Sequence, residues 1–105
     1  MADFRSDITT AMSLNAAVRR TPEGLDEVAR SLEKAPIEAD AAPSLAAWET
    51  TNLHTVATAL VLAATRRTES RGCHFREDVP QRDEGWRRRI VTTLDADGEI
   101  AQELS

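Results

Sequence analysis

The sequence predicts a mainly α-helical fold: an antiparallel three-helix bundle like a spectrin repeat, followed by an irregular loop and a C-terminal β-hairpin. In the first two thirds of the chain, three segments place apolar residues three or four positions apart, which is the spacing of an amphipathic helix. After Gly72 the apolar residues alternate with polar ones, as in a half-buried strand. We expect one domain over residues 1–105, because this length is too short for two hydrophobic cores.

The first two helices are predicted over about residues 4–18 and 22–35. Either Asp3 or Ser6 can cap the first helix, and Thr21 can cap the second, with Pro22 at its first position. Pro36 ends the second helix or falls just beyond its end, and residues 36–43 form a connector. The apolar residues at helical spacing are Phe4, Ile8, Ala11, Met12 and Val18 in the first helix, and Leu25, Val28, Ala29, Leu32 and Ala35 in the second.

The third helix is predicted over about residues 44–70, starting near Ser44. It is longer than the other two, so its C-terminal end should project past them. The face that we expect to be buried consists of Leu45, Trp48, Asn52, Val56, Ala59, Leu60, Ala63 and Arg67. If Leu32 and Leu60 lie in the core, replacing either by alanine should cost about 2–5 kcal/mol of stability.

An irregular loop over residues 71–85 then leads to a hairpin over residues 86–104, whose strands are joined by an Asp97-Gly98 turn. The residues expected on one face are Trp86, Arg88, Ile90, Thr92 and Leu94 in the first strand, and Ile100, Gln102 and Leu104 in the second. Because a lone hairpin is marginal in water, we expect it to lean on the bundle or on protein outside this chain.

Composition and charge exclude several classes of function. Residues 66–89 carry eight arginines, but five acids are interleaved with them and would repel phosphates, so an ion-pair network is favoured over a nucleic-acid partner. No apolar stretch approaches the ~20 residues that span a bilayer, so no membrane partner is expected. The N-terminus lacks the layout of a secretory signal, and the single cysteine fits a reducing compartment. We therefore expect a cytoplasmic protein.

Residues that could carry chemistry are few. Cys73 and His74 are adjacent, and the other histidine, His54, lies twenty positions before His74. A zinc site needs about four ligands, so we expect no metal. Neighbouring side chains rarely point at each other, which makes a Cys–His nucleophilic pair improbable. The glycine pattern of a dinucleotide-binding turn is absent from the sequence.

Residues 66–80 form a stretch dense in charge. Three of its arginines and two of its acids can interlock as bidentate pairs that hold an irregular loop, and Gly72 can turn the chain out of the third helix at positive φ. The pattern R-x-E-S-R-G-x-H-x-R-x-D-x-P is made by Arg67, Glu69, Ser70, Arg71, Gly72, His74, Arg76, Asp78 and Pro80.

This pattern closely resembles the signature found late in the succinate dehydrogenase/fumarate reductase flavoprotein family, which includes the L-aspartate oxidases. The resemblance continues upstream in Asn52-Leu53-His54-Thr55-Val56-Ala57 and downstream in Gln81-Arg82-Asp83-Glu84-Gly85-Trp86, so it covers nearly the whole chain. Cys73, where succinate dehydrogenases usually have alanine, and Trp86-Arg87-Arg88-Arg89 favour the L-aspartate oxidase branch.

The resemblance implies that the chain is the C-terminal helical domain of a longer FAD enzyme. That parent would transfer a hydride from L-aspartate to FAD and give iminoaspartate for quinolinate and NAD synthesis. The family's cofactor-binding and substrate-binding residues lie upstream of this segment. We therefore expect no catalytic residues, no bound FAD and no activity in this chain. The nine pattern residues are expected instead at an interface with the flavin-binding and capping domains of the same parent.

Three alternatives stay open on the sequence alone. The same domain could belong to a succinate dehydrogenase or fumarate reductase flavoprotein. The chain could also be a free-standing helical adaptor that grips an acidic partner with its arginine-rich loop. A small cytosolic enzyme that uses Cys73 and His74 is the third alternative, although no activity is indicated.

Overall fold

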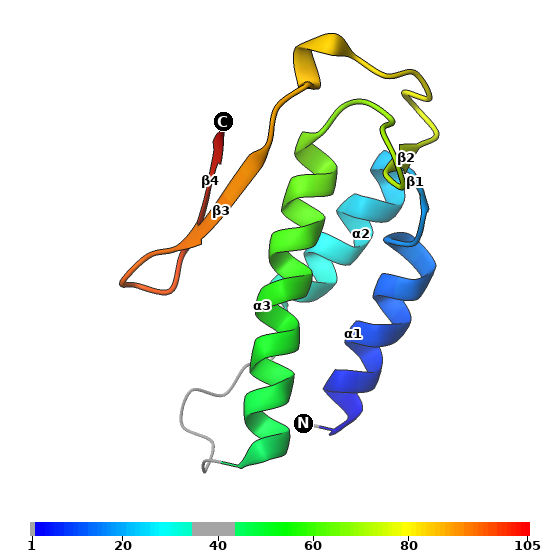
Figure 1. Cartoon of the computed structure of the whole chain (residues 1–105). Helices are drawn as coiled ribbons and strands as arrows, with labels where there is room; N and C mark the ends of the chain where they lie inside the picture. Colours follow the sequence, from blue (N-terminus) through cyan, green and yellow to red (C-terminus); the bar gives the residue numbers. More distant parts are fainter. Residues whose placement is uncertain (1, 35–43) are drawn as a thin grey trace.

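The structure is a computed structural model that describes residues 2–34 and 44–105, and it is mainly helical. The helices are α1 (Ala2–Asn15), α2 (Pro22–Glu33), α3 (Leu45–Arg66) and a single 3₁₀ turn, η1 (Glu84–Trp86). The strands are β1 (Arg19–Arg20), β2 (Phe75–Arg76), β3 (Ile90–Leu94) and β4 (Ile100–Leu104). In Figure 1, α1 and α3 run towards the end that carries the loop, and α2 runs back between them. The prediction of three helices followed by a hairpin is confirmed.

Local capping fixes where α2 and α3 begin. The Thr21 hydroxyl accepts a hydrogen bond from the Gly24 N–H at 3.0 Å, and the Ser44 hydroxyl accepts one from the Ala47 N–H at 3.0 Å. Each cap satisfies one of the N–H groups that the first helical turn leaves without a partner. The predicted Thr21 cap is confirmed, and so is the predicted start of the third helix near Ser44. The predicted end of the second helix and its connector, residues 35–43, lie outside the described residues.

The predicted bounds of the first helix are wrong. It begins at Ala2, so neither Asp3 nor Ser6 is its N-cap, and it ends at Asn15. Val18 therefore lies outside the helix and is exposed, because the chain has already turned towards strand β1.

The hydrophobic core lies among the three helices. Its main members are Ile8, Ala16, Val28, Leu32, Ala57 and Val61, and Leu25 is also fully buried. From α3 the core receives chiefly small or β-branched side chains, so this helix lies close to its neighbours. The buried Thr50 hydroxyl donates to the Ala46 carbonyl at 2.9 Å, so no polar group is left unsatisfied there.

The predicted extent and buried face of the third helix are both wrong. The helix ends at Arg66 rather than residue 70, and it buries Thr50, Ala57, Val61 and Ala64. The face expected in the core is instead largely exposed: Leu45, Trp48, Val56 and Leu60 all lie at the surface. The helix is apolar almost all round, so its periodicity alone did not decide which side meets α1 and α2. Leu60→Ala therefore should not carry the cost of a core substitution.

Two small sheets complete the fold. Strands β1 and β2 pair in parallel, with Arg19 opposite Phe75, which ties the loop after α3 to the segment after α1. Strands β3 and β4 pair antiparallel, with Ile90 opposite Leu104 and Leu94 opposite Ile100. The predicted start of the hairpin at Trp86 is wrong, because that residue belongs to η1.

The hairpin contacts the helical bundle through hydrogen bonds to α3, as predicted. Arg66 Nη1 donates to the Gln102 carbonyl at 3.0 Å, and Gln102 Nε2 donates to the Ala59 carbonyl at 3.3 Å. Gly98 has a φ of 82° and forms the turn between the two strands. Among the described residues, no helix is long and apolar enough to cross a bilayer.

Candidate functional site

The ion-paired loop, residues 67–83, follows the end of α3 and contains most of the predicted pattern. Arg67 ends the helix by taking an extended conformation, with φ −78° and ψ 98°. Its guanidinium then donates to a Glu69 carboxylate oxygen at 2.7 Å and to the Trp86 carbonyl at 2.8 Å. The helix ends before residue 70 because these bonds replace the next helical turn.

Glu69 lies at the centre of the loop and is 0 % exposed. Its carboxylate accepts hydrogen bonds from Arg67, from Arg71 Nε at 2.9 Å and from the Asp83 N–H at 3.0 Å. Burial alone would raise the pKa of Glu69, but the hydrogen bonds from Arg71, Asp83 and Arg67 together lower the pKa from 4.5 to about 2. The carboxylate is therefore ionised and fully bonded, which makes it a structural anchor rather than a proton donor.

Arg76 and Asp78 form a second, bidentate ion pair. Arg76 Nε and Nη2 donate to the two carboxylate oxygens of Asp78 at 3.0 and 2.9 Å. The hydrogen bonds from Arg76 lower the pKa of Asp78. The buried Arg76 guanidinium also donates to the Thr65 carbonyl at 2.7 Å, so it caps the C-terminal end of α3 with a positive charge.

Ser70 and Gly72 give the loop its shape. The Ser70 hydroxyl accepts from the Arg76 N–H at 2.9 Å and donates to the Val79 carbonyl at 2.7 Å. Gly72 has a φ of 59° and lies in a tight turn in which Arg71 and His74 exchange backbone hydrogen bonds. The positive φ predicted for Gly72 is confirmed, although the turn lies inside the loop rather than at the end of the helix.

His74 is fixed between two arginines. Arg20 Nη1 lies 2.8 Å from His74 Nδ1, and the Arg67 carbonyl lies 3.1 Å from Nε2. Because arginine only donates, Nδ1 accepts and Nε2 carries the proton, so the ring is neutral. Partial burial, together with the charges of Arg20, Arg67 and Arg76, lowers the pKa of His74. Since both ring nitrogens are engaged, His74 is not placed to activate the exposed Cys73.

The predicted interlocking of the loop is thus confirmed for Arg67, Glu69, Arg71, Arg76 and Asp78. Partners from outside the pattern also hold the loop, and no signal in the sequence predicted them. Arg20 reaches His74 from the segment after α1, and Trp86 Nε1 donates to the Thr68 hydroxyl at 2.9 Å. The Arg67 guanidinium also stacks 5.2 Å from the centre of the Trp86 ring. These partners lie too far away in the sequence for local spacing to indicate them.

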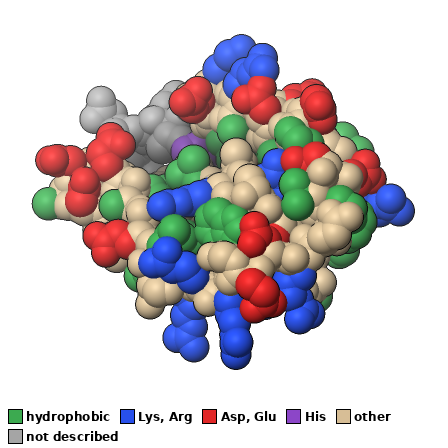
Figure 2. Space-filling view, turned by 90° about the horizontal axis from the view of Figure 1, so that it is seen from above, with side chains coloured by type: hydrophobic (Ala, Val, Ile, Leu, Met, Phe, Trp, Pro, Cys, Tyr) green, Lys and Arg blue, Asp and Glu red, His purple; other side chains and the backbone are tan. Residues whose placement is uncertain are grey.

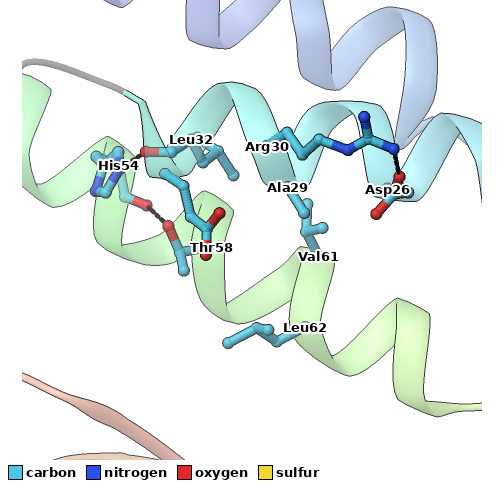
Figure 3. A pocket seen from close by; sticks show the side chains of 9 residues that line it. Asp26, Ala29, Arg30, Leu32, His54, Thr58, Val61 and Leu62 are labelled. Carbon is cyan, nitrogen blue, oxygen red and sulfur yellow. Dashed lines mark hydrogen bonds and ion pairs between the residues drawn. The ribbon is translucent and has the colours of Figure 1, made fainter.

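The described residues also form hollows at the surface. A groove of about 500 Å³ between α2 and α3 is lined by four apolar and five polar or charged residues, and an Asp26–Arg30 ion pair lies at its edge (Figure 3). In this groove His54 Nε2 lies 2.8 Å from the Leu32 carbonyl, and the Thr58 hydroxyl donates to the His54 carbonyl at 2.8 Å. The contact between His54 and the Leu32 carbonyl therefore links α3 to α2.

A shallower hollow of about 410 Å³ beside η1 is lined by Arg67, Arg71, Trp86, Arg87, Arg88 and Arg89. Figure 2 looks down on this end of the molecule and shows several basic side chains gathered along one edge. Glu69 neutralises two of the arginines that line the hollow. The hollow is therefore basic and open to solvent.

The described residues do not provide a site for a metal or for a dinucleotide. Among residues 2–34 and 44–105, no three His, Cys, Asp or Glu side chains are grouped to hold a metal ion. A dinucleotide is commonly held where a strand meets a helix through a glycine-rich turn. Gly72 and Gly98, the glycines with positive φ in the described part, lie instead in hairpin turns. The residues present therefore do not fit FAD.

Comparison with known proteins identifies the source of the pattern. Residues 5–104 match the family described as fumarate reductase flavoprotein C-term. The chain is 40% identical to the L-aspartate oxidase of Streptomyces coelicolor over 109 residues, covering 94% of this chain and 19% of the relative. It is 34% identical to the succinate dehydrogenase flavoprotein subunit of Rickettsia felis over 115 residues, which cover 95% of this chain and 19% of that subunit.

A solved structure agrees with these matches. The chain superposes on FrdA of E. coli quinol fumarate reductase with a TM-score of 0.86 and 26% identity, covering 99% of this chain and 20% of that one. This chain thus spans about a fifth of the length of the proteins that it resembles. It belongs to the succinate dehydrogenase/fumarate reductase flavoprotein family, whose C-terminal domain it matches.

Proposed function

We propose that this chain is the C-terminal packing domain of an FAD-dependent L-aspartate oxidase of the cytoplasm. The observation that carries the proposal is the 40% identity with the Streptomyces coelicolor L-aspartate oxidase over 94% of this chain. In that reaction FAD would accept a hydride from L-aspartate, which becomes iminoaspartate for quinolinate and NAD synthesis. Cys73 and the Trp86–Arg89 run support the same branch.

The role of this domain would be structural. Its buried charges are bonded to one another, and Glu69 in particular is ionised and enclosed by donors. Of the nine pattern residues, Gly72, Asp78 and Pro80 are exposed. We propose that the ion-paired loop presents this outer surface to the flavin-binding and capping domains of the parent, while the inward-facing side chains keep the loop rigid. FAD and substrate would be bound by the parent's other domains.

A succinate dehydrogenase or fumarate reductase parent is the second candidate. It is favoured by the 34% identity with the Rickettsia felis subunit and by the TM-score of 0.86 with the E. coli fumarate reductase.

Grafting separates the two candidates. Residues 5–104 would replace the matching segment in the Streptomyces coelicolor enzyme and, separately, in the Rickettsia felis subunit. We expect the first chimera to oxidise L-aspartate nearly as fast as its unmodified parent, and the second to lose more of its succinate oxidation. If instead the Rickettsia felis chimera keeps its succinate oxidation and the Streptomyces coelicolor chimera loses more of its L-aspartate oxidation, the chain belongs to the second candidate. The isolated chain should show neither flavin absorbance nor turnover, and stoichiometric FAD on it would contradict a purely structural role.

A further inference from the structure

Helix α3 has the composition of an interior helix. Residues 50–65 include no Asp, Glu, Lys or Arg, although 30% of the whole chain is charged. Glu49 near its start is paired with Arg5 at 2.9 Å, and Arg66 at its end donates to the Gln102 carbonyl. Helices that are apolar on all sides are normally covered on all sides.

Only one side of α3 is covered by the rest of the described chain. Ala57, Val61 and Ala64 face the core, whereas Trp48 is 60 %, Val56 63 % and Leu60 40 % exposed. Leu62 is also exposed, but it lines the groove between α2 and α3. We call the other large exposed apolar residues of this helix the outer stripe of α3; its members are Leu45, Trp48, Val56 and Leu60. Figure 1 shows α1 on one side of α3, the hairpin on the other and α2 behind, so no described element covers the side that faces the viewer.

Asn52, one turn from both Trp48 and Val56, is an exposed polar residue within the outer stripe, whereas the threonine hydroxyls of α3 are already bonded within the helix. Five threonine hydroxyls on the helix donate to backbone carbonyls four residues earlier, at 2.8–3.1 Å. A hydroxyl bonded in this way needs no further partner. The threonines with such bonds are Thr50, Thr51, Thr55, Thr58 and Thr65. The helix can therefore be covered by another apolar surface without leaving these donors unsatisfied.

We propose that the outer stripe of α3 is a second docking surface, separate from the ion-paired loop, by which this domain packs onto an apolar face of the flavin-binding part of its parent chain. This inference rests on the proposed function. The chain spans 19% of the Streptomyces coelicolor L-aspartate oxidase and 20% of the E. coli FrdA chain, so about four fifths of each relative lies outside it. In a full-length parent, the missing four fifths would be linked to this domain in one polypeptide and could cover the stripe.

The size and chemistry of the stripe favour this occupant over others. Four side chains offer much less than the ~800 Å² per partner of a stable interface between separate proteins. A small apolar contact suffices when both surfaces belong to one chain, because the linkage makes binding intramolecular. An acidic partner would instead bind the arginines beside η1, since the stripe carries no cation. Trp48 is the largest side chain of the stripe and is the expected anchor.

The test measures burial of the stripe by cysteine labelling, in the Streptomyces coelicolor chimera and in the isolated chain. Val56→Cys reports on the stripe, and Ser31→Cys is the matched control, because Ser31 is exposed and belongs to α2, outside the stripe. Both variants carry Cys73→Ala, which removes the exposed native thiol. Labelling at each site is read by peptide mass spectrometry, so the measurement does not depend on turnover.

We expect the Val56→Cys variant to react at least about tenfold more slowly in the chimera than in the isolated chain, and the Ser31→Cys variant to react equally in both. Equal rates for Val56→Cys would overturn the inference. Slow labelling in the isolated chain, together with a dimer in sedimentation, would also overturn it and identify a second copy as the occupant. A chimera that protects the stripe but does not oxidise L-aspartate would contradict the proposed parent while supporting the docking surface.

Discussion

Replacing Glu69 by glutamine removes the charge at the centre of the ion-paired loop while keeping the shape of the side chain. Arg67 and Arg71 then lose the carboxylate that both of them bind. The new amide group also brings two donors into a site where Arg67, Arg71 and the Asp83 N–H already donate. The variant should therefore be destabilised because fixed positive charges remain without a counter-charge.

The magnitude follows from the pKa of Glu69. Folding lowers this pKa from 4.5 to about 2, and each pKa unit corresponds to about 1.4 kcal/mol, so the ionised carboxylate contributes about 3 kcal/mol. Removing one partner of a buried ion pair costs about 3–5 kcal/mol. Because Arg67 and Arg71 are each partly exposed, we expect the lower end of that range. For a chain of this size, that loss lowers the melting temperature by roughly 10–20 °C.

The effect has a defined pH dependence. The folded pKa of Glu69 lies below its unfolded value, so the carboxylate stabilises the fold fully above pH 4.5. This stability is lost as the pH falls from 4.5 towards about 2. The difference in unfolding free energy between the wild type and Glu69→Gln should therefore be about 3 kcal/mol at neutral pH and shrink steadily in acid.

Urea unfolding followed by far-UV circular dichroism, repeated from neutral pH to about pH 2, measures this difference. Glu77→Gln is the matched control, because Glu77 pairs with Arg19 at 3.1 Å on the surface and should cost at most about 1 kcal/mol. A loss below about 1 kcal/mol for Glu69→Gln at neutral pH would refute the argument. A difference that stays constant across the whole pH range would refute it as well.

Three further substitutions test local features by the same unfolding assay. Leu32→Ala should cost about 2–5 kcal/mol, but Leu60→Ala about 1 kcal/mol or less, because Leu32 is in the core and Leu60 is exposed; equal losses would contradict the assignment of the buried face. Thr21→Ala should cost about 1 kcal/mol through loss of the α2 cap, and no change would show that the hydroxyl is dispensable. Gly72→Ala should cost about 1–2 kcal/mol from its φ of 59° alone, because no atom lies within 4 Å of the added methyl; a stabilised variant would contradict that backbone conformation.

Features that depend on neighbouring residues could be predicted from the sequence. The Thr21 cap acts over three positions, so a hydroxyl just before an apolar repeat was sufficient to indicate it. The same holds for the ion pairs of the loop. Arg67 and Arg71 each lie two positions from Glu69, and Arg76 lies two positions from Asp78.

Features that depend on distant residues could not be predicted in this way. The apolar pattern of α3 fits two opposite faces, and only packing against α1 and α2 selects the one with Ala57 and Val61. Strands β1 and β2 are two residues long and more than fifty positions apart, with no alternating pattern to mark them. The bond from Arg20 to His74 depends on that pairing, so it was missed for the same reason.

These helices are expected to be one domain of a much longer flavoprotein, and the size of the native product decides whether they are. An immunoblot of the cells that encode the chain, probed with an antibody raised against it, tests this claim most directly. Because the chain spans 19% of its Streptomyces coelicolor relative, we predict a band roughly five times heavier than 11.5 kDa. A native product that migrates at 11.5 kDa would contradict the claim.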